Sequence, residues 1–175
     1  MKLRACAAAL ALAAAGHAVA ATTTLRVYFN NAQRAAVPAD CAIVFERARQ
    51  VPRTEGVAAA ALRQLFAGPT EAERADGYRS PFSAATAGLL RRVVIEHGTA
   101  YVDLNDLREH LAGATSSCGA AEFQTQVEHT LRQFPTVRRV ILAIEGEPRR
   151  FYEWMGQDCD LSNDQCEPGP LRRRR

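Results

Sequence analysis

The chain has 175 residues and a formal net charge of +3, and 47% of its residues are hydrophobic. A chain of this length and composition can form one globular domain with a hydrophobic core. The positive charge comes from Lys2, Arg4 and the arginines at positions 172–175, so the rest of the chain is slightly acidic. We therefore expect no nucleic-acid-binding face, because such a face needs a concentrated positive charge.

The first twenty residues have the three parts of a secretory signal peptide. A basic start, MKLR, precedes an alanine-rich apolar run at residues 5–15, and AVA at residues 18–20 supplies small residues for cleavage before Ala21. The apolar run is too short to span a membrane well, and Cys6 lacks the small preceding residues of a lipoprotein cleavage site. We therefore expect export to the periplasm or the cell exterior, without stable membrane insertion after cleavage.

Four cysteines follow the signal peptide, at positions 41, 118, 159 and 166. An even number of cysteines in an oxidising compartment favours disulfides. Cys159 and Cys166 are close in sequence, so a local bond between them leaves Cys41 to pair with Cys118. The alternative is a metal site, which would need paired spacings such as C-x-x-C, and the sequence contains none.

The first half of the chain predicts two strands and a helix. Alternating apolar residues indicate a strand at residues 25–29, and residues 42–45 indicate a second, short strand followed by a charged segment. We expect Thr54 to cap a helix. This helix ends at Gly-Pro (residues 68–69) because Gly adopts a left-handed cap and Pro lacks the N–H. The polar segment 70–83 is expected to be a loop. The apolar face of the helix is formed by Ala58, Ala61, Leu62, Leu65 and Phe66.

Residues 90–105 predict a β-hairpin with its turn at His97-Gly98, since Gly tolerates the positive φ of a tight turn. A two-residue loop fixes the register of the two strands. The predicted facing pairs are Ile95–Ala100, Val93–Val102, Val94–Tyr101 and Arg92–Asp103. The last of these pairs joins opposite charges across the strands.

The second half predicts a further helix and strand. Asn105 is expected to cap a short helix, and a small-residue loop at residues 113–119 precedes a longer helix that ends at Pro135. Residues 137–144 indicate the last strand. The buried stripe of the longer helix is Ala120, Phe123, Val127, Thr130, Leu131 and Phe134. This order of elements predicts an α+β fold of the βαββαβ type, with one mixed sheet covered by helices.

Four short blocks resemble the GerMN domain, a module named from spore germination and sporulation proteins. They are LFAGPT at residues 65–70, GTAYVDLN at residues 98–105, TLRQFPTV at residues 130–137 and EG at residues 145–146. The resemblance spans residues 25–146. It implies a non-catalytic domain of the cell envelope, without a cofactor, that serves interaction or assembly with an envelope protein or a cell-wall component.

We therefore divide the chain into three parts. Residues 1–20 are the signal peptide, residues 21–150 the GerMN-like domain, and residues 151–175 an aromatic segment, a disulfide-closed acidic loop and a basic tail. The sequence contains no G-x-S-x-G, phosphate-binding loop or H-E-x-x-H motif, so we expect no enzyme. Two other functions stay open: a periplasmic protein that binds a small ligand or a cation, and an exported hydrolase with scattered catalytic residues.

Two groups of aspartates could hold a cation. Asp158, Asp160 and Asp164 alternate with other residues as in a calcium loop, but the loop lacks the central Gly and the bidentate Glu. Asp103 and Asp106 lie close in sequence, but a cross-strand arginine and the start of a helix account for them. We therefore expect no metal site at either group.

Aromatic residues and a methionine gather near the end of the chain, at Phe151, Tyr152, Trp154 and Met155. Such a concentration is typical of a surface patch that contacts a partner. The same residues can instead fold back as a C-terminal cover on the core. The sequence leaves both alternatives open.

The signal peptide gives a first testable prediction. Protein recovered from the cell envelope should begin at Ala21, because cleavage follows the small residues of the A-x-A site. Intact-mass measurement of the exported protein checks this. A mass that retains residues 1–20, or that includes a lipid, would contradict the prediction.

Overall fold

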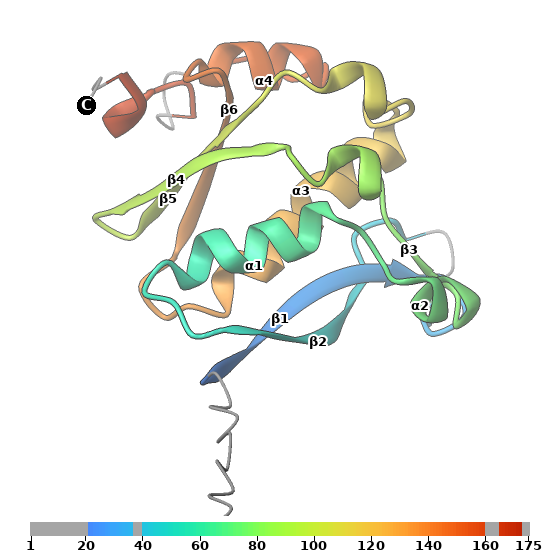
Figure 1. Cartoon of the computed structure of the whole chain (residues 1–175). Coiled ribbons are helices and arrows are strands. Elements are labelled where there is room, and N and C mark those ends of the chain that lie inside the picture. Colours follow the sequence, from blue (N-terminus) through green and yellow to red (C-terminus); the bar gives the residue numbers. More distant parts are fainter. Residues whose placement is uncertain (1–20, 37–39, 160–164, 173–175) are drawn as a thin grey trace, which may run out of the picture.

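The computed structural model describes residues 21–36, 40–159 and 165–172 (Figure 1). The expected signal peptide, residues 1–20, lies outside this part, so its cleavage stays a prediction. Within the described residues, the structure has no helix with the length and apolar character needed to cross a membrane.

The first sheet contains three antiparallel strands in the order β2-β1-β3. Strand β1 (Thr22–Asn31) pairs along its length with β2 (Val44–Pro52), and only its last two residues pair with β3 (Tyr78–Arg79). The strand expected at residues 25–29 is therefore present and longer than predicted.

The second sheet has the order β4-β5-β6. Strands β4 (Leu90–Glu96) and β5 (Thr99–Leu104) form the predicted hairpin, and β5 pairs in parallel with β6 (Arg139–Ile144). His97 and Gly98 have φ values of 50° and 85°, as a two-residue turn of this kind requires. The predicted register is confirmed at Ile95–Ala100, Val93–Val102, Val94–Tyr101 and Arg92–Asp103.

Two helices lie between the sheets (Figure 1). Helix α1 (Val57–Phe66) contacts β1 and β4, and α3 (Ser117–Arg132) contacts β1 and β6. The short helix α2 (Glu71–Ala75) lies beside β3, and α4 (Pro148–Trp154) lies at the top of Figure 1 against β6. Three 3₁₀ turns complete the described elements: η1 (Ala84–Thr86), η2 (Arg108–His110) and η4 (Gly169–Arg172).

The α+β class is confirmed, but the strands form two small sheets instead of one mixed sheet. The reason lies at the edge of β1 that faces away from β2. There the side chain of Gln133 accepts from the N–H of Arg26 at 3.0 Å and donates to its C=O at 2.6 Å. The N–H of Tyr28 donates to the Thr130 hydroxyl at 3.3 Å. Because side chains from the end of α3 and from its C-cap Gln133 occupy these backbone groups, no strand of the second sheet can pair with them.

Two segments expected to be irregular are regular. The charged segment after Phe45 continues β2 as far as Pro52, with Arg47 and Arg49 alternating toward the interior. The expected loop at residues 70–83 contains α2 and β3. The sequence T-x-x-E at residues 70–73 carries the capping-box signal for α2, which the sequence analysis missed.

Two expected helix caps are wrong. Helix α1 begins at Val57 with Gly56 as its N-cap, and the Thr54 hydroxyl accepts from the N–H of Gly56 at 3.1 Å instead of capping the helix. The Asn105 side chain donates to the C=O of Gly88 at 2.8 Å, and only a 3₁₀ turn follows it. Thr54 therefore stabilises a local turn, whereas Asn105 contacts a residue 17 positions away in the chain.

One main hydrophobic core extends from the first sheet through the helices to α4. Four aromatic rings form a chain through it, from Phe66 to Phe82, Phe123 and Phe151, with ring centroids 4.8–5.5 Å apart. All four are at most 2% exposed. This row of aromatic contacts joins α1, α3 and α4 into one body.

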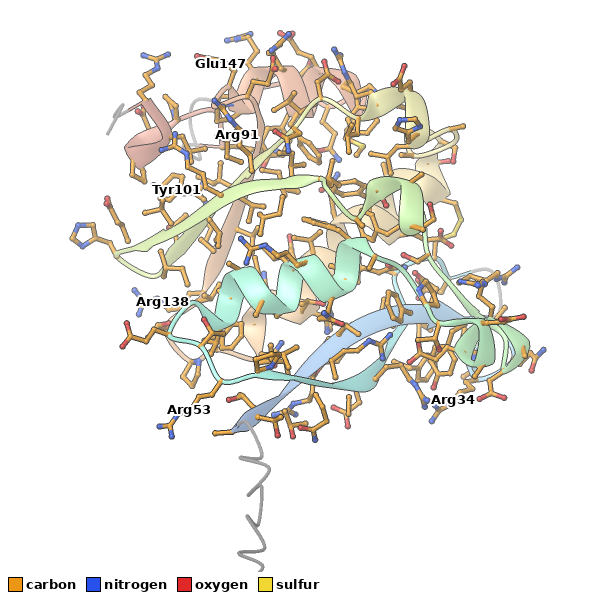
Figure 2. All side chains as sticks on the ribbon, viewed as in Figure 1. Arg34, Arg53, Arg91, Tyr101, Arg138 and Glu147 are labelled. Atoms are coloured by element: carbon orange, nitrogen blue, oxygen red, sulfur yellow. A yellow bond between two sulfur atoms is a disulfide. The ribbon has the colours of Figure 1, made fainter. Side chains whose placement is uncertain are left out.

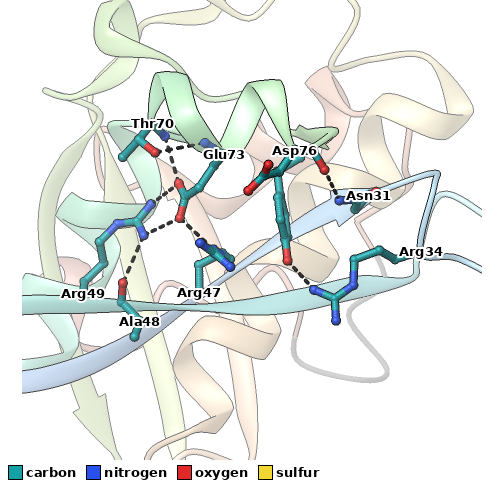
Figure 3. Close-up of polar contacts among 9 residues, drawn as sticks. Asn31, Arg34, Arg47, Ala48, Arg49, Thr70, Glu73 and Asp76 are labelled. Atoms are coloured by element: carbon teal, nitrogen blue, oxygen red, sulfur yellow. Dashed lines mark hydrogen bonds and ion pairs between the residues drawn. The ribbon is translucent and has the colours of Figure 1, made fainter.

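A buried carboxylate ties α2 to β2 (Figure 3). Glu73 is 3% exposed, and its side chain accepts from Arg49 at 2.6 and 2.7 Å, from Arg47 at 2.9 Å and from the N–H of Thr70 at 2.8 Å. Burial by itself would raise the pKa of Glu73. The two guanidinium groups and the Thr70 N–H outweigh burial and hold this pKa at about 2, below its ordinary value of 4.5.

Glu73→Gln should destabilise the fold at neutral pH, because it leaves Arg47 and Arg49 without their buried counter-charge. We expect a loss of about 3–5 kcal/mol in the free energy of unfolding, measured by urea denaturation. The carboxylate contribution is complete above pH 4.5 and is lost as the pH falls toward about 2, so the two proteins should converge there.

Glu71→Gln is the matched control, since Glu71 lies in the same first turn of α2 but is exposed. It should change the free energy of unfolding by no more than about 1 kcal/mol. A Glu73→Gln variant with the stability and acid dependence of the native chain would contradict the assignment.

Candidate functional site

A groove of about 1130 Å³ opens where the ends of several elements meet, beside β3. We call it the β3 groove. Its walls combine aromatic and small apolar side chains with a few charged ones. The lining residues are Asn30, Asn31, Ala32, Ala35, Asp40, Cys41, Ile43, Pro69, Arg74, Tyr78, Arg79, Ser80, Pro81, Phe82, Ser83, Ala84, Ala85, Ala112, Gly113, Ala114, Ser116, Cys118, Gly119 and Glu122.

A buried amide network fixes one wall of the groove. Gln126 of α3 donates to the side-chain oxygen of Asn30 at 2.6 Å and accepts from the Ser80 hydroxyl at 2.6 Å. Asn30 in turn donates to the backbone oxygens of Cys41 and Ile43 at 2.7 and 2.9 Å. These bonds join β1, α3 and the segments around residues 41–43 and 80, so the wall is held by hydrogen bonds from three directions.

A disulfide forms the adjoining part of the lining. Cys41, in the loop between β1 and β2, is bonded to Cys118 in the first turn of α3, with a Cα–Cα distance of 5.4 Å. The second disulfide joins Cys159 to Cys166 at a Cα–Cα distance of 5.5 Å, in the C-terminal segment. Both distances lie in the usual range for disulfides. The pairs are the two that the cysteine spacing predicts, and the metal alternative would need free thiols.

The charged groups of the groove comprise both signs. Burial raises the pKa of Glu122, and the positive charge of Arg79 partly opposes this shift. Arg74 donates to the backbone oxygen of Pro69, and Asp40 accepts from the N–H of Ala42 at 2.9 Å. The groove can therefore offer a carboxyl group and guanidinium groups to a ligand, next to apolar walls.

The side chains that line the β3 groove can contact a ligand through charges, hydrogen bonds and apolar surface. The two cysteines of the lining are joined in a disulfide. Among the described residues, the structure brings together no group of three or more His, Cys, Asp or Glu side chains that could hold a metal ion. Within the same residues, the histidines lie apart: His97 is in the hairpin turn, His110 in η2 and His129 on α3, and all three are exposed.

The aspartates considered as ligands lie apart from the groove. Asp158 is exposed, while Asp160 and Asp164 lie outside the described residues, so the expectation of no calcium site there is not tested. Asp106 is paired with Arg108 at 2.7 and 2.8 Å, and hydrogen bonds from this arginine lower the pKa of Asp106. Asp103 is fully buried.

The aromatic segment covers the core. Phe151, Tyr152 and Met155 are 0%, 4% and 4% exposed, so they cannot form the partner patch that was one of the two alternatives. Trp154 is partly exposed and packs edge-to-face against the rings of Phe151 and Phe123. The segment folds as α4, which places its apolar side on β6 and α3.

The sequence did not predict the residues of the β3 groove, because the groove is formed by segments that are far apart in the chain. One signal was present: Gln126 falls on the buried stripe of α3, between Phe123 and Val127, where a polar side chain needs a partner. The expected bond between Cys41 and Cys118 was a second signal, since it already places the β1–β2 loop beside the start of α3.

The fold defines a small α+β domain with two three-stranded sheets. The Germane family model, described as sporulation and spore germination, matches residues 26–150. This chain therefore belongs to the Germane family, which confirms the resemblance to GerMN domains. A comparison with curated proteins found no match.

Two solved structures are similar to this chain. The tandem GerMN domains of the sporulation protein GerM from Bacillus subtilis share 22% identity at a TM-score of 0.50, covering 72% of this chain and 40% of that one. The first GerMN domain of the same protein shares 21% identity at a TM-score of 0.46, covering 71% of this chain and 84% of that one. The present chain thus spans about 40% of the length of the tandem-domain protein.

The disulfides give a prediction for this region. Non-reducing peptide mapping of the exported protein should yield the linked peptides Cys41–Cys118 and Cys159–Cys166. Replacing Cys41 and Cys118 together by Ser should cost about 2–5 kcal/mol of unfolding free energy, because this bond closes the longer loop. The matched Cys159→Ser/Cys166→Ser variant should lose less. Four free thiols, or the reverse order of stability losses, would contradict this.

Proposed function

We propose that this protein is an exported, non-catalytic GerMN-type module of the cell envelope, and that it binds a segment of an envelope protein in the β3 groove. The observation that carries this proposal is membership of the family over residues 26–150. The family concerns sporulation and spore germination and is no known enzyme class.

Export is supported by two independent features. The sequence of residues 1–20 has the organisation of a signal peptide. The two disulfides are stable in oxidising compartments and rare in the cytosol. Together they favour a protein that works outside the cytoplasm.

The composition of the β3 groove supports a polypeptide as the bound partner. Phe82 and Pro81 supply apolar contact surface, while Glu122 and Arg79 supply one charge of each sign. A protein segment carries apolar side chains, amides and charges in the same short length, and so can use all these groups at once. The exposed Ala84 and Ala85 in the lining leave room for its backbone.

The rigidity of the groove supports the same proposal. Its wall is fixed by the Gln126 network and by the Cys41–Cys118 disulfide before any ligand binds. A preformed site loses less conformational entropy on binding than a flexible one. The described groove side chains also comprise no nucleophile beside a base, so its groups favour binding over turnover.

Ala85→Trp should block partner binding without harming the fold, since Ala85 is exposed and lines the groove. After cross-linking in the envelope, the partner recovered with this variant should fall at least about tenfold, as expected when a bulky residue occupies the centre of an interface. The melting temperature should stay near that of the native protein.

Ala48→Trp is the matched control, because Ala48 is exposed on β2 and does not line the groove. It should leave partner recovery unchanged. Equal recovery with Ala85→Trp would place the partner elsewhere. Turnover of a wall-derived or ester substrate, abolished by replacing one or two side chains, would overturn the non-catalytic function.

A further inference from the structure

Other parts of the structure protect three of the sheet edges from further pairing. Gln133 and Thr130 bind the outer backbone groups of β1, as described above. The N–H of Leu142 in β6 donates to the Tyr152 hydroxyl at 3.3 Å, and that of Ile144 donates to a backbone oxygen in the turn after β6. On β2 the edge carries a proline and inward-pointing arginines, which are known to blunt edge strands.

Strand β4 is different. The residues that flank a two-residue turn form a hydrogen-bonded pair, so Glu96 and Thr99 bond to each other, as do Val94 and Tyr101 two residues further on. The N–H and C=O groups of Val93 and Ile95 therefore point away from β5. No hydrogen bond from elsewhere in the described residues reaches these four groups.

The same edge exposes an apolar side chain. Ile95 is 36% exposed and is the sole exposed large hydrophobic residue in the described ranges 21–36, 40–159 and 165–172. An open strand edge next to an exposed apolar side chain is a template for pairing with another strand. We call the backbone of Val93 and Ile95 with their side chains the β4 edge.

We propose that the β4 edge pairs antiparallel with the β4 edge of a second copy of this chain. With the two-fold axis at Val94, Val93 faces the partner's Ile95, and Ile95 faces the partner's Val93. The two pairs exchange roughly four backbone hydrogen bonds. The exposed isoleucines then lie on one face of a continuous sheet, each covered by the partner's valine.

The charges along β4 favour a second copy over an unrelated strand. Arg91 and Arg92 share one carboxylate, that of Asp103, so the N-terminal part of β4 keeps a net positive charge. In this register Arg92 lies opposite the partner's Glu96, and Glu96 lies opposite the partner's Arg92, so this positive charge faces an acidic residue at both ends of the pairing. The irregularity between Leu90 and Arg92 interrupts the regular edge on the N-terminal side. It limits pairing to the segment centred on Val94, so the register is defined.

Self-association goes beyond the proposed function and does not depend on it. The hairpin lies at the left of Figure 1, while β3 and α2, which flank the groove, lie at the right. Figure 2 shows the same separation: Arg138, which donates to the C=O of His97 in the hairpin turn at 3.3 Å, and Arg34, which donates to the hydroxyl of the groove residue Tyr78, are at opposite ends. The two sites can therefore be tested separately.

The test introduces opposite charges at residue 95 in two separate variants, Ile95→Arg and Ile95→Glu. In the proposed register the two copies of residue 95 are diagonal neighbours, within reach of long side chains. Ile95→Arg alone and Ile95→Glu alone each place like charges together across the interface, and each should weaken the dimer by up to about fivefold through this charge pair. The lost burial of the apolar Ile95 side chain weakens it further. An equimolar mixture of the two variants brings opposite charges together and should associate more tightly than either variant alone.

The association of the native chain, of each variant and of the mixture is measured by sedimentation equilibrium over a range of concentrations. Ala48→Arg adds the same charge on the exposed side of β2 and should dimerise like the native chain. A native chain that stays monomeric at every soluble concentration would overturn the proposal. So would single variants that dimerise as the native chain does, or a mixture no tighter than its components. Thermal melts that match the native chain would show that loss of dimer is not loss of fold.

Discussion

The fully buried carboxylate of Asp103 is the group on which the second half of the structure depends. The N–H of Gly146 donates to it at 2.6 Å, and Arg91 and Arg92 both reach it at 3.2 Å. Arg92 also donates to the backbone oxygen of Leu171 in η4. Leaving such a buried charge unpaired would cost about 3–5 kcal/mol. The residues that pair with Asp103 come from the irregular start of β4 and from the turn after β6, and Arg92 also binds the C-terminal segment. The buried carboxylate therefore keeps these three segments together.

Local interactions explain which features could be predicted from the sequence. The turn at residues 97–98 sets the hairpin register within a few residues, so Arg92 could be assigned to Asp103 in advance. The other two partners could not. Arg91 reaches the carboxylate because the strand is irregular at that position, and Gly146 is 43 residues away in the chain. Hydrophobic periodicity likewise predicted α3. It could not predict the bonds from Gln133, at the end of α3, to β1, because these residues are 107 positions apart. These bonds help to divide the strands between two sheets.

Charged residues caused the main errors in the expected elements, because their partners are distant. Because Arg47 and Arg49 are charged, the sequence of β2 resembles that of a solvent-exposed segment. Both side chains nevertheless point inward and pair with Glu73. The groove was hidden for a related reason: its lining comes from loops whose meeting depends on Gln126 and on the Cys41–Cys118 bond. Buried polar groups thus define the parts of this fold that a hydrophobic pattern cannot show.

The separation of the groove from the β4 edge has a mechanical consequence. Pairing through β4 extends the second sheet at the hairpin end and leaves both grooves open at the other end (Figure 1). Two grooves on one rigid dimer could hold two segments of the same assembly, and the second binding event would then be intramolecular. Such an arrangement raises the effective affinity of a weak groove without any new contact in it, provided the two segments match the spacing of the grooves. Weak individual sites and a defined dimer geometry together would make binding selective for an ordered array of partners over single free ones.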